Sequence, residues 1–352
     1  MGEQKKRNSF IDELRGCAIL LVVIGHILQF VIKVPLDGFA FAAIYSFHMP
    51  LFMFLAGYSL SLGHSDLKIA YVAKRMVCLF VSFFVWGGAM VYIVHNAGSL
   101  ADVVLNPAYS LWFLWVLAWI TFFVWFGQKI SLRLKREVGY ALVILALAAL
   151  DFVLDTWRFA FNLIATHCVF FVIGYKLKNY WSGRSADFKF FVKLCSALLF
   201  FTLLLFWRFP QSFMLEKPVM TFLKESVFPR FVLIYVRAVF FVLKRYAMPL
   251  SGIVVVISVC QFLHKLLSQR AKDLIAFLGT RTIDVYSMHI FIVCVSPCFL
   301  KNKWIDALVK FVLGIAIPLA VGSLLRKNVW TNFLFLAGKM PSVGRSHGER
   351  EA

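Results

Sequence analysis

The sequence has too little charge for a soluble protein. Only 15% of its 352 residues are charged and 61% are apolar, whereas soluble globular proteins have about 25% charged and roughly 45–50% apolar residues. This composition excludes a soluble enzyme with a single anchor and a disordered chain. A membrane β-barrel is also excluded, because its apolar residues would alternate along each strand, and here they form continuous runs.

Several catalytic and metal-binding signatures are missing as well. The chain has no Gly-x-Ser-x-Gly, no Walker loop, no His-Glu-x-x-His and no dinucleotide-binding fingerprint, which argues against a soluble-type hydrolase and against ATP-driven transport. Its seven cysteines lie in apolar runs without a Cys-x-x-Cys pair. We therefore interpret them as small buried hydrophobic residues and expect no metal site.

Apolar runs of about 20 residues, the length that crosses a bilayer, fill most of the chain. We predict transmembrane helices near residues 14–34, 41–63, 71–95, 109–127, 139–156, 158–176, 189–207, 246–264, 282–300 and 304–326. The stretch 229–245 contains Arg237, Lys244 and Arg245, so we interpret it as an interfacial segment that leads into the eighth helix.

The net charge of +20 is interpreted as a topology signal, and no nucleic-acid partner is expected. With a cytoplasmic N-terminus, the inward segments hold 23 Lys and Arg residues and the outward segments hold 8. This bias follows the positive-inside rule and predicts that both termini are cytoplasmic. The predicted fold class is an all-α, polytopic integral membrane bundle of about ten transmembrane helices, with one domain over residues 1–330 and a short basic cytoplasmic tail over 331–352.

Ionisable residues at membrane depth are costly and are therefore candidates for function. Arg15 and His26 are eleven residues apart, which is close to three helical turns and a rise of roughly 16 Å. Both side chains thus share one face, and Asp12 lies one turn before Arg15, where it can orient the guanidinium. The alternatives are a positive-inside anchor for Arg15 and a core histidine for His26. We predict that His26 is the general base, because histidine titrates near neutrality.

Other candidates lie near the ends of predicted helices. His48 sits beside Pro50, which lacks a backbone N–H, so His48 either contacts substrate or bonds the carbonyl that Pro50 frees. Lys74 and Arg75 begin the third helix on the predicted cytoplasmic face, where they bind either anionic lipid or the phosphates of a cytosolic donor. Trp112 begins the fourth helix at the outer interface, where it belongs to an aromatic belt or stacks against a sugar ring.

The ninth predicted helix carries a further polar set. Arg281, Asp284, Tyr286 and His289 approach from the cytoplasmic side, and His289 lies about two turns into the helix. Asp284 and Tyr286 are the expected partners of His289. His167 in the sixth helix has no motif around it, so we interpret it as a packing residue.

Together these residues form an ordered set of short motifs. They are Asp12-x-Leu14-Arg15-Gly16, the spacing of Arg15 and His26, Phe47-His48-Met49-Pro50-Leu51-Phe52, Leu111-Trp112-Phe113-Leu114 and Tyr286-x-x-His289. In this order the chain resembles acyltransferase family three of integral membrane O-acyltransferases. It is most similar to the fucose 4-O-acetylase-like sugar acetyltransferases, and the resemblance covers residues 8 to about 325.

The resemblance implies an enzyme of the bacterial inner membrane. Such an enzyme transfers an acetyl group from cytosolic acetyl-CoA to a sugar hydroxyl of an envelope polysaccharide, such as O-antigen, capsule or exopolysaccharide, or of a lipid-linked sugar. It implies that Arg15 and His26 are essential, with His26 either deprotonating the acceptor or briefly carrying the acetyl group. The family often has two arginines at the start of the third helix, whereas here Cys78 stands where the second is expected.

Under this hypothesis the donor and acceptor sites use different residues. Lys74, Arg75 and Arg15 hold the phosphates or pantetheine arm of acetyl-CoA, which is a substrate, and no bound cofactor is expected. His48 and His289 contact the acceptor or hold His26, and Trp112 and Tyr286 support them. Membrane lipids are the other expected partners, and the oligomeric state stays open. The alternatives are succinyl transfer to periplasmic glucans and a proton-coupled transporter, which would leave acetyl-CoA untouched.

Overall fold

The described chain is almost entirely helical. A computed structural model describes residues 9–35, 38–63, 66–94, 100–154, 158–181, 183–208, 212–226 and 229–341. The chain divides into two compact units, Met1–Ser65 with Thr166–Ile315 and Asp66–Ala165 with Ala316–Ala352. Helices α8 (Phe161–Trp181) and α15 (Lys303–Leu325) have residues in both units.

The first unit carries most of the predicted site residues. Its other elements are α1 (Ser9–Ile27), η1 (Leu28–Ile32), α2 (Phe39–Tyr45), α3 (His48–Gly63), α9 (Ala186–Phe206), β1 (Trp207–Arg208), β2 (Ser212–Phe213), α10 (Glu216–Glu225), α11 (Arg230–Val242), η4 (Leu243–Ala247), α12 (Met248–Leu266), α13 (Gln269–Thr280), α14 (Thr282–Ile290) and η5 (Phe291–Val295). The two short strands pair antiparallel, with Trp207 opposite Phe213.

The second unit carries the basic pair at the start of the third predicted helix. Its other elements are α4 (Ile69–Val94), α5 (Leu100–Leu105), η2 (Pro107–Tyr109), α6 (Trp112–Leu134), α7 (Gly139–Leu154), η3 (Arg158–Ala160) and α16 (Val329–Leu336). Helix α16 packs on α4, where Trp86 Nε1 donates to the carbonyl of Phe335 at 2.7 Å. The tail predicted from residue 331 thus begins within a packed helix, and residues 342–352 lie outside the described chain.

The prediction of a polytopic helical membrane bundle is confirmed, with fewer long spans than the ten expected. Eight helices in the described chain are long and apolar enough to cross a membrane, or nine if the bent pair of α13 with α14 and η5 forms one span. The pair bends by 68°. The predicted span 139–156 is α7, whose 16 residues reach only about 24 Å, short of a hydrocarbon core of about 30 Å.

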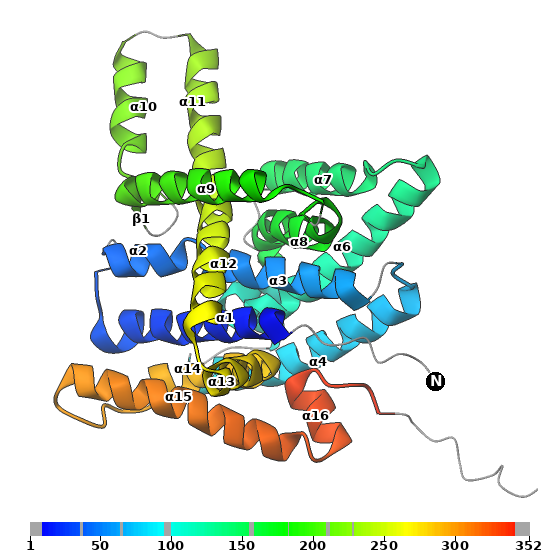
Figure 1. The fold of residues 1–352 in the computed structure, drawn as a ribbon, viewed down its shortest axis with the longest axis vertical. Coiled ribbons are helices and arrows are strands. Elements are labelled where there is room, and N and C mark those ends of the chain that lie inside the picture. The colour runs from blue at the N-terminus through cyan, green and yellow to red at the C-terminus, as the bar shows by residue number, and fades with distance from the viewer. Residues whose placement is uncertain are drawn as a thin grey trace, which may run out of the picture. The chain divides into compact units, whose positions relative to one another are not determined.

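The ambiguous stretch 229–245 is continuous with the helix that follows it. Arg230–Leu266 forms one helical run of 37 residues, in which α11 passes through the π-helical turn η4 into α12 (Figure 1). The charge of Lys244 is accommodated because its Nζ lies 3.0 Å from Oε2 of Glu216. Helices α10 and α11 lie side by side as a hairpin (Figure 1).

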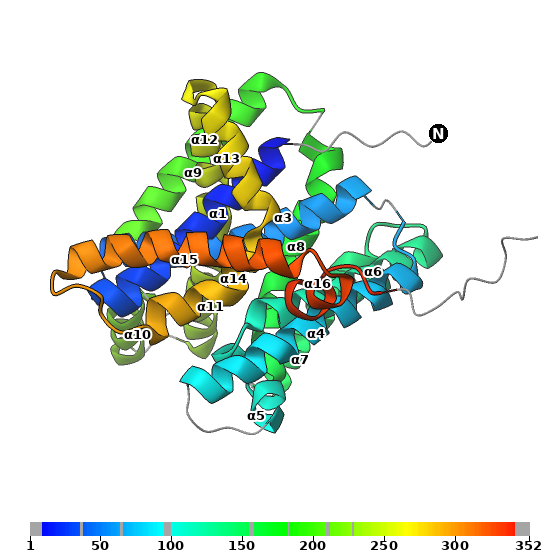
Figure 2. The ribbon, with the colours of Figure 1, turned by 90° about the horizontal axis from the view of Figure 1, so that it is seen from below.

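Glycines allow two very close helix crossings in the first unit. A Cβ at Gly16 of α1 would overlap the carbonyl of Ile275 in α13, and a Cβ at Gly279 of α13 would overlap the carbonyl of Asp12. Figure 2 shows α13 lying beside α1. Gly57 of α3 meets the backbone of α8 in the same way, since a Cβ there would overlap the carbonyl of Phe171, and small residues let membrane helices approach this closely.

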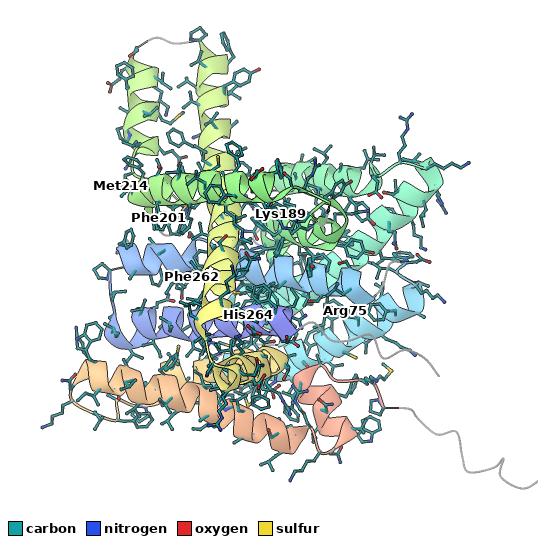
Figure 3. The ribbon with its side chains drawn as sticks, in the orientation of Figure 1. Arg75, Lys189, Phe201, Met214, Phe262 and His264 are labelled. Atoms are coloured by element: carbon teal, nitrogen blue, oxygen red, sulfur yellow. The ribbon has the colours of Figure 1, made fainter. Side chains whose placement is uncertain are left out.

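The outer surfaces of several helices are apolar. Phe201 of α9 and Phe262 of α12, both labelled in Figure 3, expose more than half of their surface. Exposed aromatic side chains on long apolar helices are what a lipid environment accepts. Polar residues that are buried among these apolar helices in the first unit are therefore candidates for function.

Candidate active site

Two histidines from distant parts of the chain meet inside the first unit. His26, near the end of α1, and His289, in α14, are 263 positions apart, and Nδ1 of His26 lies 2.9 Å from Nε2 of His289. Nδ1 of His289 lies 2.8 Å from the carbonyl oxygen of Val285 and 3.0 Å from that of Tyr286. His289 is fully buried, while His26 is half-buried. This pair is the centre of the candidate site.

Aromatic rings surround His26 on the side of α1 and α2. The His26 ring stacks on Phe30 with centroids 5.9 Å apart and meets the edge of Tyr45 at 6.5 Å. The hydroxyl of Tyr45 donates to Oε1 of Gln29 at 2.6 Å. These contacts restrict the orientation of the His26 ring.

His48 lies on the other side of Tyr45. Their ring centroids are 4.8 Å apart, and Nδ1 of His48 lies 2.9 Å from the carbonyl of Ile44, to which it donates. The helix breaks between α2 and α3, one turn before the predicted kink at Pro50, which lies in the first turn of α3 where no intrahelical donor is required. His48 thus bonds a carbonyl near this break, but not that of Ser46, which Pro50 would free, and both predicted roles of His48 stay predictions.

The opposite end of α1 carries an ionic cluster. Nη1 of Arg15 lies 3.4 Å from Oδ1 of Asp12, as their spacing predicts, and Arg15 remains partly accessible. The neighbouring Glu13 is buried, and its Oε2 lies 2.7 Å from Nδ1 of His264 at the end of α12. Figure 3 labels His264 where α12 approaches α1. The sequence interpretation missed this link, since nothing local connects residues 251 positions apart.

The break between α13 and α14 holds an arginine beside a buried carboxylate. Arg281 lies at this break, and its Nη1 is 3.8 Å from Oδ2 of the fully buried Asp284. Asp284 forms an ion pair with Arg281, and its expected contact with His289 stays a prediction. Tyr286 contributes its backbone carbonyl to His289, and the two rings are 6.4 Å apart.

A buried lysine in α15 was also missed by the sequence interpretation. Lys310 Nζ donates to the carbonyl of Ser296 at 3.0 Å and lies 3.8 Å from Oδ2 of Asp306. Asp306 in turn accepts from the backbone N–H of Phe299 at 2.7 Å. The signal was present in the sequence, because Asp306 and Lys310 are four residues apart in an otherwise apolar run.

The remaining predicted site residues belong to the second unit. Lys74 is exposed on α4. Nη1 of Arg75 donates to the hydroxyl of Tyr71 at 3.1 Å, and its buried Nε has no hydrogen-bond partner in the described chain. Trp112 begins α6 and packs edge-on against Phe113, with centroids 6.3 Å apart. Their roles in binding donor and acceptor stay predictions.

Comparison with known proteins identifies the family. Residues 8–327 match the family described as "Acyltransferase domain". The chain belongs to this acyltransferase family. The matched range contains every predicted site residue and both histidines of the central pair, so the resemblance seen in the sequence motifs is confirmed.

Two curated relatives of this acyltransferase are nodulation proteins NolL. Those of Sinorhizobium fredii and Mesorhizobium japonicum are each 34% identical to it, over 126 and 132 residues. The matches cover 32% and 33% of this chain and 34% of each relative. The chain thus matches about a third of the length of these relatives. No solved structure matches it significantly.

The acyltransferase domain offers no grouped metal ligands in the part of the chain that the structure describes. No set of three or more His, Cys, Asp or Glu side chains there is arranged to hold a metal ion. The chemistry that the described residues do offer is a histidine pair, with an arginine at the other end of the same helix.

Proposed function

We propose that this multi-pass membrane protein is an O-acetyltransferase of the bacterial inner membrane. It transfers an acetyl group from cytosolic acetyl-CoA to a sugar hydroxyl of an envelope polysaccharide or its lipid-linked precursor. The observation that carries the proposal is the hydrogen-bonded pair of His26 and His289 inside an acyltransferase domain. Such a pair supplies an oriented imidazole, which acyl transfer to a hydroxyl needs as a general base.

In the proposed reaction His26 works from its Nε2 atom. The acceptor hydroxyl gives its proton to Nε2, and the hydroxyl oxygen forms a bond to the thioester carbonyl carbon. The carbon–sulfur bond then breaks, and the leaving thiolate takes the proton back from His26. The products are the sugar acetate and free CoA, and His26 returns to its starting state.

The test is acetyl transfer by membranes that contain the wild-type chain. Membranes are incubated with acetyl-CoA labelled in the acetyl group and with an envelope glycan fraction. We expect label in the glycan that mild base releases as acetate, as an ester requires. If only labelled succinyl-CoA gave labelled glycan, the transferred group would be succinyl and not acetyl. If neither donor labelled the glycan, the proposal would be overturned. If His26 itself became labelled when no acceptor was present, the reaction would pass through a covalent acetyl-histidine and not by direct transfer.

Arg15→Gln is expected to weaken donor binding. We propose that Arg15, which is partly accessible beside Asp12, bonds a phosphate of acetyl-CoA. A hydrogen bond to a charged group contributes about 1.5–3 kcal/mol, so the KM for acetyl-CoA should rise about tenfold or more. The kcat should change less, because the phosphate lies far from the reacting carbonyl. Initial rates at varied acetyl-CoA concentration measure both constants.

The matched control for this variant is Arg270→Gln. It removes the same charge from an exposed position on α13, so a general loss of positive charge would affect both variants equally. An unchanged KM in Arg15→Gln, whatever happens to kcat, would contradict a role of Arg15 in holding the donor.

A further inference from the structure

The hydrogen positions of the histidine pair follow from the acceptors around His289. Its Nδ1 faces the carbonyl oxygens of Val285 and Tyr286 at 2.8 and 3.0 Å. Carbonyl oxygens only accept hydrogen bonds, so Nδ1 carries the hydrogen. In neutral histidine the other nitrogen then has a lone pair. Nε2 of His289 is therefore an acceptor.

This acceptor determines the tautomer of His26. Nδ1 of His26 lies 2.9 Å from Nε2 of His289, so the hydrogen between the two rings belongs to Nδ1 of His26. The lone pair of neutral His26 is then on Nε2. Nδ1 of His26 cannot serve as the base, because it faces His289 and carries the hydrogen between the two rings.

We infer that His289 is a positioning residue that holds His26 in the tautomer with a basic Nε2. The inference rests on the proposed function, because it assigns the chemistry to His26. When Nε2 of His26 takes the acceptor proton, Nδ1 continues to donate to His289. His289 thus accepts the same hydrogen bond before and after proton transfer, and it neither gains nor loses a proton.

Besides His289, the backbone carbonyl of Val22, one turn earlier in α1, accepts a hydrogen bond from the His26 ring, whereas the neighbouring rings fix only the plane of the imidazole. Phe30 stacks on the imidazole and has no polar atom, and the hydroxyl of Tyr45 donates to Gln29. His48 uses its own Nδ1 to donate to the carbonyl of Ile44. The titratable groups that face His26 are His289, His48 and Tyr45. Cys294 lies beyond Tyr45 and Lys310 beyond Cys294, while Asp284 and Tyr286 lie on the same helix as His289.

The test compares the kcat and KM values of two substitutions at His289. Leu at position 289 cannot accept a hydrogen bond, whereas the carboxamide oxygen of Gln can accept one from Nδ1 of His26. We expect His289→Leu to lower kcat about 100-fold, within the range of general-base effects, with unchanged KM for both substrates. His289→Gln should recover kcat to within about tenfold of the wild type. A wild-type kcat in His289→Leu, or equal loss in both variants, would overturn the inference.

A spectroscopic measurement keeps the inference testable if His289→Leu does not fold. In full-length wild-type protein labelled with ¹⁵N-histidine, the ¹⁵N shifts report which ring nitrogen carries hydrogen. The His26 signals are assigned as those lost in His26→Asn. We expect hydrogen on Nδ1 of His26, and hydrogen on Nε2 would overturn the inference.

The same preparations separate this inference from the proposed function. If the wild type transfers no acetyl group, the proposed function fails. If the wild type is active, His26→Asn is inactive and His289→Leu is fully active, only the role of His289 fails.

Discussion

His26→Asn should lower the kcat of acetyl transfer by about 10²–10⁴-fold, the usual contribution of a general base, while the protein still folds. The amide nitrogen of Asn is placed like Nδ1 of His26, so the variant can still donate to His289. It has no basic nitrogen, however, to take the acceptor proton. The change therefore removes the chemistry and keeps the hydrogen bond between α1 and α14. Initial rates at saturating acetyl-CoA and acceptor measure the effect.

The matched control is the same substitution at His264. This histidine is partly exposed at the end of α12 and bonds Glu13, an interaction that Asn can also make. His264→Asn should retain kcat within about threefold, since it lies outside the proposed reaction. Equal losses in both variants would indicate a general effect of losing a histidine, and full activity of His26→Asn would contradict general-base catalysis by His26.

Gly279→Leu should prevent the first unit from folding to a stable form. Even the Cβ of the new side chain would overlap the carbonyl of Asp12 in α1, and a backbone atom cannot move aside unless α1 and α13 separate. Overpacking by side-chain atoms costs typically 1–3 kcal/mol and occasionally more. An overlap with backbone atoms, which cannot rotate away, belongs above this range and outweighs the gain of about 1 kcal/mol in helix propensity. We expect loss of the monodisperse peak in size-exclusion chromatography and of acetyl transfer in membranes.

Gly63→Leu provides the comparison for this variant. Gly63 is also helical, at the end of α3, and nothing lies within 4 Å of a Cβ built there. The same substitution should leave chromatography and activity near wild type. If Gly279→Leu behaved like Gly63→Leu, the close crossing of α1 and α13 would not be required for the fold.

The sequence by itself determined the helical class and one face of the candidate site. Continuous apolar runs with few charges leave helices as the way to satisfy the backbone in a membrane. The helical repeat places Arg15 and His26 on one face of α1, because that geometry is local. The ordered motifs were sufficient to identify the family, which the match over residues 8–327 confirms.

The break between α2 and α3 was predicted only in part. Proline cannot hydrogen-bond to the residue four positions earlier, and the helix does break there, one turn before Pro50, but the sequence did not show that Pro50 would stand in the first turn of a new helix. Whether a proline kinks a helix or begins one depends on where the preceding helix ends. That point is set by packing, which the sequence pattern does not give.

Only the tertiary structure decided which residues meet. His26 bonds His289 and Glu13 bonds His264 across more than 250 positions, and no periodic pattern relates such distant residues. The approach of α1 to α13 depends on Gly16 and Gly279, whose missing side chains let two backbones touch. Periodicity fixes the direction of a side chain on its own helix, whereas its partner is fixed by which helices can pack closely.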